Sequence, residues 1–219
     1  DLAWLGALAR ERGVLLMVDN CFATPYLQRP IEHGASIVIH SATKYIDGQG
    51  RVLGGAILGS AALIADDRFF ARHTGPSMSA FNAWVLSKSL ETLAVRMDRH
   101  CSNALALARH FEGHPSVSAV RYPFLPSHPQ HELATHQMNG RYGGMVTVII
   151  DGDLARTKQV LERVQVFTLA ESLGGVESLV NHPAIMTHAS VPKEVREAGG
   201  VTDNLIRLSV GVEDVAGVA

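Results

Sequence analysis

The chain has 219 residues, 47% of them hydrophobic, so it can bury a substantial core as one large domain or two small ones. Its formal net charge of -2 gives no electrostatic reason to expect a nucleic acid or an anionic membrane as a partner, and no apolar stretch approaches the length of a membrane span. Two cysteines are too few for a disulfide scaffold, and the 11 histidines form no recognised metal-binding pattern, so we expect no metal.

The first part of the chain alternates helical and strand patterns, as in a parallel sheet. Residues 1–12 have the pattern of an amphipathic helix. The apolar runs at residues 14–18 and 37–39 are too short for buried helices and rich in branched side chains, so we predict two strands covered on both faces. Residues 54–58 are predicted to form a further strand.

The rest of the chain is predicted to form a long helical connector and a second α/β region. Residues 79–110 carry apolar positions at helical spacing and are predicted as one or two long helices. A new alternation then begins, with predicted strands at 117–122, 145–150 and 205–210 and predicted helices at 155–164 and 193–199. We therefore predict two domains, residues 1–110 and 111–219, with a boundary close to His110.

Polar side chains follow the first two predicted strands at the points where they end. Asp19 comes directly after the first strand, and His40, Ser41, Thr43 and Lys44 follow the second. In open parallel sheets, ligands bind beyond the carboxyl ends of the strands, so both groups are expected at one crevice. One amine, one carboxylate and two hydroxyls match the aldehyde, the pyridine nitrogen and the phosphate of pyridoxal phosphate (PLP).

Each of these residues also has an ordinary explanation when taken alone. Asp19 suits a loop or a helix cap, Ser41 and Thr43 suit a turn, and Lys44 suits a solvated surface position. Cys21, close to Asp19, and Cys101 in a helical pattern are both expected to be small buried thiols. Only the combination of the four polar residues points to a cofactor site.

At these residues the chain resembles the Cys/Met-metabolism family of PLP-dependent enzymes, which includes cystathionine synthases and lyases, methionine lyase and homoserine-ester sulfhydrylases. The resemblance is carried by DNCFATPYLQRPIEHGASIVIHSATKYIDGQGRVLGG at residues 19–55. It continues through LPSHPQHEL at 125–133, SLGGVESL at 172–179, HP at 182–183 and LIRLSVGVED at 205–214. It implies a fold type I PLP-dependent transferase, with part of a large parallel-sheet cofactor domain followed by a smaller C-terminal α/β domain.

The resemblance also implies a role for individual residues. Lys44 matches the Schiff-base lysine, which carries protons between substrate and cofactor, and Asp19 matches the aspartate paired with the pyridine nitrogen. Ser41 and Thr43 match phosphate contacts. The substrate's α-carboxylate is matched to Ser172 and Arg207.

Arg207 also has an ordinary explanation that does not involve substrate binding. It lies in an alternating stretch that reads as a strand, where an arginine can simply point into water. Its planar guanidinium nevertheless suits a carboxylate held by two parallel hydrogen bonds. The resemblance favours the substrate-binding role.

The chain departs from the family at its ends. Relatives have a long N-terminal portion with a phosphate-binding glycine loop, an aromatic residue that stacks on the cofactor ring, and an arm that reaches a neighbouring subunit. We therefore expect a fragment, a processed chain or a truncated one, with weaker PLP affinity than a complete relative.

The resemblance implies a trans-sulfuration enzyme of cysteine and methionine metabolism, and two groups of relatives compete. Residues 45–51 are similar to O-succinylhomoserine sulfhydrylases, whereas residues 171–179 are more similar to cystathionine gamma-synthases and gamma-lyases. We expect gamma-replacement with sulfide or a thiol on an O-activated homoserine, with gamma-elimination by a cystathionine or methionine gamma-lyase as the alternative. A catalytically idle fragment is a third possibility. The family implies a cytoplasmic homo-oligomer, a tetramer built as a dimer of dimers.

Overall fold

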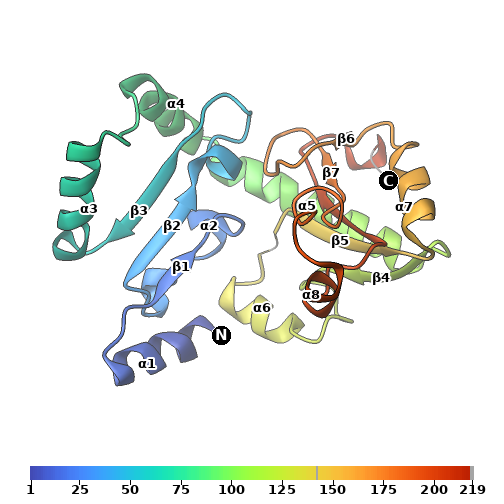
Figure 1. Cartoon of the computed structure of the whole chain (residues 1–219), viewed down its shortest axis with the longest axis horizontal. Helices are drawn as coiled ribbons and strands as arrows, with labels where there is room; N and C mark the ends of the chain where they lie inside the picture. The colour runs from blue at the N-terminus through green and yellow to red at the C-terminus, as the bar shows by residue number, and fades with distance from the viewer. Residues whose placement is uncertain (142, 218–219) are drawn as a thin grey trace. The chain divides into compact units, whose positions relative to one another are not determined.

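The computed structural model describes residues 1–141 and 143–217, and its internal contacts divide the chain into two compact units (Figure 1). The first unit comprises Asp1–Val95 and Thr135–Arg141. The second comprises Arg96–Ala134 and the described residues that follow Arg141. A domain boundary close to His110 remains a prediction.

The first unit contains a three-stranded sheet in the order β1-β2-β3. β1 (Met17–Asp19) pairs in parallel with β2 (Ile37–Ser41), and β3 (Gly55–Gly59) pairs with β2 in the antiparallel direction. The helical segments of this unit are α1 (Leu2–Arg12), α2 (Thr24–Leu27), the 3-10 turn η1 (Pro30–His33), the π-helical turn η2 (Ala42–Ile46), α3 (Ala61–Thr74), α4 (Ala80–Leu90) and the start of α5 (Leu93–Glu112).

The structure confirms the opening helix and corrects the first strand. Asp1 caps α1 by accepting a hydrogen bond from Trp4 N–H at 2.9 Å, and Gly13 ends the helix in the left-handed conformation. The strand predicted at 14–18 starts only at Met17, because the Val14 N–H is still bonded to the Ala9 carbonyl of the helix end. The chain therefore reaches the sheet later than its apolar run suggests.

β3 also differs from the expected parallel arrangement. The connection between β2 and β3 runs from residue 42 to residue 54 and contains only the single turn η2. Parallel neighbours are usually joined through a helix that crosses the sheet, whereas this connection contains only η2 and returns the chain antiparallel to β2. The helix α3 was not predicted, and it buries none of its side chains.

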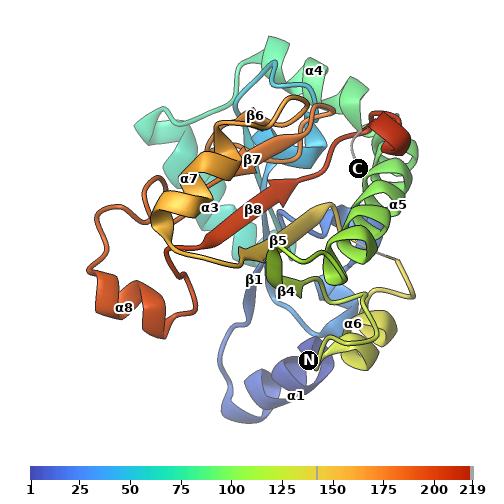
Figure 2. The same ribbon diagram turned by 90° about the vertical axis from the view of Figure 1, so that its right-hand side faces the viewer.

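The second unit contains a five-stranded sheet in the order β4-β5-β8-β7-β6, which can be followed in Figure 2. The neighbouring strands are antiparallel except β6 and β7, which are parallel. The elements after α5 are β4 (Val117–Arg121), α6 (His131–Gln137), β5 (Met145–Ile150), α7 (Leu154–Leu161), β6 (Thr168–Leu169), β7 (Leu179–Asn181), α8 (Lys193–Ala198), β8 (Leu205–Ser209) and the 3-10 turn η3 (Val215–Gly217).

The predicted elements of the second region are confirmed, with small shifts at their ends. β4, β5 and β8 are the three predicted strands, α7 and α8 are the two predicted helices, and residues 79–110 form α4 and most of α5. β6 and β7 were missed because they have only 2 and 3 residues. On β5, Val146, Val148 and Ile150 are buried at alternate positions, so this strand supplies one side of the core. In the described part of the chain, no helix has both the length and the apolar character of a membrane span.

Candidate active site

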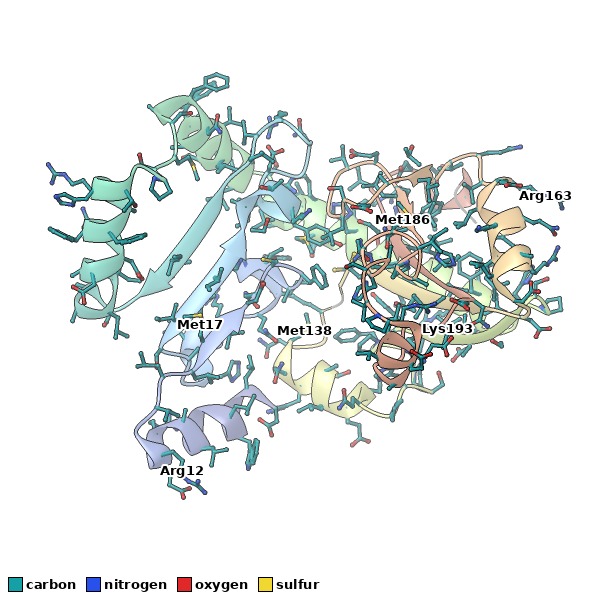
Figure 3. The ribbon with its side chains drawn as sticks, in the orientation of Figure 1. Arg12, Met17, Met138, Arg163, Met186 and Lys193 are labelled. Carbon is teal, nitrogen blue, oxygen red and sulfur yellow. The ribbon has the colours of Figure 1, made fainter. Side chains whose placement is uncertain are left out.

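Asp19 ends β1 and is bound by the residue two positions further on. The Cys21 N–H donates to Asp19 Oδ1 at 3.0 Å, which closes a tight turn at the end of the strand. Hydrogen bonds from the Cys21 thiol and from this N–H lower the pKa of Asp19, against the smaller opposing effect of burial. Asp19 is exposed, and so is Met17 on the same strand (Figure 3). The strand end therefore carries an ionised, accessible carboxylate.

Cys21 joins the ends of β1 and β2. Its Sγ accepts a hydrogen bond from the Ser41 N–H at 2.7 Å. Burial raises the pKa of the Cys21 thiol, as does its bond to Asp19, whereas the positive charge of Lys44 lowers it. Cys21 therefore lies among three of the predicted site residues and is only half-buried, in contrast to the expectation, whereas Cys101 is buried as expected.

The segment after Asp19 borders a pocket of about 330 Å³. Asn20 holds this segment through its Nδ2, which donates to the carbonyls of Thr24 at 3.1 Å and Gln28 at 2.9 Å. Gln28 Nε2 donates in return to Asn20 Oδ1 at 2.9 Å. The pocket is lined by Asp19, Asn20, Cys21, Phe22, Ala23 and Gln28. A reciprocal amide pair thus fixes the backbone beside the exposed carboxylate.

The two predicted phosphate-binding hydroxyls have different surroundings. Thr43 Oγ1 accepts from the Gly54 N–H at 3.0 Å and donates to the Gly54 carbonyl at 3.3 Å, so it ties the lysine turn to the start of β3. The Ser41 hydroxyl makes no hydrogen bond to any residue that the structure describes. Ser41 is therefore better placed than Thr43 to donate to a bound anion, because Thr43 already uses its proton.

His40 lies at the end of β2 and is only 4% exposed. Its Nδ1 has no hydrogen-bond partner among the described residues. Burial lowers the pKa of His40, against the opposing effect of the Asp19 charge. The ring is therefore held neutral near the carboxylate rather than paired with it as a cation.

Lys44 lies in η2, directly after β2. Its φ of -87° and ψ of -129° are not helical, although the turn around it is closed by the Asp47 N–H on the Ala42 carbonyl at 2.8 Å. The turn packs in a cluster of buried apolar side chains: Ala42, Ile46, Val52, Val85 and Leu86. Lys44 itself is half-buried.

The polar contacts that follow Lys44 were not predicted from the sequence. The Asp47 side chain is fully buried and forms an ion pair with Arg51, whose Nη2 lies 3.1 Å from Asp47 Oδ1. Arg51 also donates to Ser89 on α4. The i, i+4 spacing of Asp47 and Arg51 was the available signal, but a loop containing Gly48 and Gly50 gave no reason to place the two side chains together.

In the second unit, Ser172 and Arg207 lie on neighbouring segments. Arg207 is half-buried on β8, opposite Thr147 on β5 and Asn181 on β7. Its Nη2 donates to the carbonyl of Glu171 at 3.3 Å, next to the exposed Ser172. Arg207 is therefore not simply solvated, because it is bound to the segment that carries Ser172.

The structure thus gathers the predicted residues in two groups, one in each unit. In the first unit, Asp19 and the Ser41 N–H are both hydrogen-bonded to Cys21. Lys44 is near enough for its charge to lower the pKa of the Cys21 thiol, and Thr43 precedes Lys44 in sequence. Ser172 and Arg207 form the second group. The roles of the residues in both groups remain predictions, and Cys21 as the link within the first group was not predicted from the sequence.

Comparison with known proteins identifies the family. The sequence model of the "Cys/Met metabolism PLP-dependent enzyme" family matches residues 1–219. The chain belongs to this family. It is 50% identical over 217 residues to a cystathionine beta-lyase of Coxiella burnetii, covering 98% of this chain and 56% of that protein. It is 48% identical over 219 residues to an O-succinylhomoserine sulfhydrylase of Mycobacterium tuberculosis, covering 98% and 54%.

Solved structures agree on the fold. A cystathionine gamma synthase from Xanthomonas oryzae pv. oryzae matches with a TM-score of 0.95 and 41% sequence identity, over 100% of this chain and 56% of that one. The chain therefore has the α/β fold of the Cys/Met-metabolism enzymes, as predicted, and spans about half the length of the relatives it matches.

The residues of the first group fit PLP, the cofactor of the family, by their chemistry. The carboxylate of Asp19 has a lowered pKa, which suits a partner for a protonated pyridine nitrogen. Lys44 is the primary amine that an aldehyde requires, and the Ser41 hydroxyl has a proton to donate to a phosphate. The donor set is thus consistent with the cofactor of the Cys/Met-metabolism family.

Proposed function

We propose that this chain supplies the cofactor lysine and the carboxylate-binding arginine of a PLP-dependent trans-sulfuration enzyme that performs gamma-replacement on an O-activated homoserine. One observation carries the proposal: Asp19, with its lowered pKa, is joined through Cys21 to the strand end that precedes Lys44. The family and the names of the relatives support the class of chemistry.

The residues of the first unit each have a defined task in this proposal. Bound PLP would act as an electron sink for the bonds around the substrate's α-carbon. Asp19 would hold a proton on the pyridine nitrogen, and Ser41 would donate to the phosphate. Thr43 would join it only by releasing the bond of its hydroxyl to the Gly54 carbonyl. When neutral, Lys44 Nζ would take the proton from the α-carbon and return it at a later step.

Arg207 and Ser172 would bind the substrate's α-carboxylate. The Arg207 guanidinium has five N–H donors, and its contact with the Glu171 carbonyl involves Nη2. A planar fork binds a carboxylate with direction as well as charge, which a lysine at this position would not do. Arg207→Lys is therefore expected to weaken substrate binding more than the retained charge suggests.

Cofactor attachment is the first test of the proposal. The purified chain would be mixed with PLP, reduced with borohydride, digested and mapped, with Lys44→Ala as the matched control. The expected result is a reduced cofactor label on Lys44 and none above background on Lys88, Lys158 or Lys193, the other lysines of the chain. Equal labelling of all four lysines would refute a dedicated site.

Gamma-elimination is the second candidate, favoured by the similarity to a cystathionine gamma-lyase of Dictyostelium discoideum at 46% identity. Both reactions would need a base for the proton on the substrate's α-carbon, the role proposed for Lys44. They differ in their products: a thiol takes the place of the γ-substituent in replacement, whereas in elimination the γ-substituent leaves and nothing takes its place. Product analysis with O-succinylhomoserine and cysteine would separate them. Cystathionine as the product supports replacement, whereas a keto acid and ammonia formed at the same rate without cysteine support elimination.

The idle-fragment alternative and the oligomeric state need separate measurements. Large apolar side chains of the first unit are exposed, including Trp4 at 60% and Phe69 at 67%, and such surfaces favour association. We propose a homo-oligomer, and light scattering of the purified chain would test it. An idle fragment would fold and associate without attaching PLP to Lys44.

A further inference from the structure

The turn that carries Lys44 is not held by its own helical hydrogen bonds alone. The φ and ψ of Lys44 depart from helical values inside η2, so the backbone at this residue takes its direction from the segments on either side. On the N-terminal side, Thr43 is bonded to Gly54 through both its backbone N–H, at 3.2 Å, and its hydroxyl. The backbone on the C-terminal side of Lys44 must therefore be held by contacts of its own.

Asp47 makes these contacts on the C-terminal side of Lys44, and its side chain is fully buried. Its Oδ2 accepts the Arg51 N–H at 2.7 Å, and its Oδ1 accepts Arg51 Nε–H at 3.1 Å. Arg51 Nη2 also donates to the Asp47 carbonyl at 3.3 Å. Both carboxylate oxygens and the backbone carbonyl of Asp47 are thus bound by one arginine, which closes residues 47–51 into a rigid loop.

Arg51 connects this loop to α4. Its Nη2 donates to Ser89 Oγ, and Ser89 Oγ donates in turn to the Val85 carbonyl at 2.8 Å. Val85 belongs to the same apolar cluster as Ala42 and Ile46, the first and last residues of η2. The lysine turn is therefore fixed to α4 by apolar packing at its ends and by a charged bridge directly after it.

We propose that Asp47 and Arg51, with Ser89 as their contact on α4, are positioning residues that set the direction and accessibility of the Lys44 amine. The proposal rests on the role of Lys44 given above. The proposal can be tested without the cofactor, because the bridge of Asp47, Arg51 and Ser89 consists only of residues of this chain. Loss of the bridge should free Lys44 without changing the three-stranded sheet.

Trace reductive methylation of the chain without PLP would test this proposal. Formaldehyde and a mild borohydride would label the amines, and mass spectrometry of the peptides would give the rate at Lys44 relative to Lys158, an exposed lysine on α7. Lys88 on α4 would report general loosening of the first unit, because it also lies there and is 55% exposed.

The variants are Asp47→Asn, Arg51→Met, Arg51→Lys and Ser89→Ala. Asp47→Asn and Arg51→Met are expected to raise the relative rate at Lys44 by about threefold or more, and the two milder variants by less, with no change at Lys88. The matched control is Glu91→Gln, which removes the exposed Lys88–Glu91 pair of the same unit, 2.7 Å long, and should leave the rate at Lys44 unchanged.

Two results would overturn the proposal. One is an unchanged rate at Lys44 in folded Arg51→Met; the other is a rise at Lys44 that Lys88 shares equally. If the first two variants fail to fold by circular dichroism, Ser89→Ala decides the question, because it leaves the buried ion pair in place: a rise confined to Lys44 supports the bridge, and no rise refutes it. Failure of PLP to attach to Lys44 would refute the proposed function without changing these rates.

Discussion

Gly211 lies where two backbone segments of the second unit approach too closely for any side chain. A Cβ at this position would lie 2.4 Å from the Val176 carbonyl oxygen and 2.7 Å from the Glu177 carbonyl carbon. Neither segment can move freely, because Val212 N–H is bonded to the same Val176 oxygen at 2.8 Å and Gly211 N–H is bonded to Ser178 Oγ at 2.9 Å. Gly211→Ala must therefore separate the segments and stretch at least one of these bonds.

The cost follows from two contributions. Overpacking costs about 1–3 kcal/mol, and a weakened hydrogen bond adds about 1 kcal/mol. We expect Gly211→Ala to lower the free energy of unfolding by about 2–4 kcal/mol, a large part of the roughly 5–15 kcal/mol typical of a domain. Urea denaturation would measure it, with Gly113→Ala as the matched control, since a Cβ there meets nothing within 4 Å. A loss below about 0.5 kcal/mol, the range of ordinary surface changes, would refute the steric argument.

Three further predictions concern single side chains. Cys21→Ala should raise the pKa of Asp19 because it removes the thiol hydrogen bond, whereas Cys21→Ser should largely preserve it, and a carbon-13 NMR titration of the carboxyl would show which holds. Burial lowers the pKa of His40, so below about pH 6.5 the unfolded chain takes up a proton that the folded chain does not. The free energy of unfolding should therefore fall as the pH drops through this value. His40→Gln should reduce this dependence of the unfolding free energy on pH, measured by urea denaturation at several pH values. Leu107→Ala, at a position with 0% exposure, should cost about 2–5 kcal/mol, whereas Val95→Ala on the same helix, where the side chain is 67% exposed, should cost about 0.5 kcal/mol or less; equal losses would contradict the packing of α5.

Sequence reasoning worked where a pattern has one structural meaning. The run of apolar and β-branched residues at 145–150 predicts a strand, and β5 forms there. The opening helix was predictable from Asp1 at its start and Gly13 at its end. These signals are local, so they can be interpreted without knowing which distant segments of the chain pack against them.

Prediction from the sequence failed where the structure of a segment depends on contacts with residues far away in the chain. Residues 14–18 are as apolar as a strand, yet the strand begins only at Met17, since the Val14 N–H is still bonded to the Ala9 carbonyl of α1. Likewise, nothing near Arg51 in the sequence indicates that it contacts Ser89, which lies 38 positions away on α4. Cys21 was expected to be a small buried thiol. Its contact with the Ser41 N–H depends on the pairing of β1 with β2, which no residue near Cys21 in the sequence indicates.

The same contacts explain why the lysine site need not depend on the second unit. The hydrogen bonds at Asp19 and Ser41 come from Cys21, and the Thr43 hydroxyl is bound by Gly54, so these bonds lie within residues 19–54. The bridge from the lysine turn to α4 adds one further element of the first unit. The substrate-binding pair, Ser172 and Arg207, belongs to the second unit. Attachment of PLP to Lys44 should therefore survive Arg207→Ala, while binding of an amino-acid carboxylate should not. A loss of cofactor attachment in that variant, with the chain still folded, would show that the two groups of residues depend on each other in a way that their hydrogen bonds do not reveal.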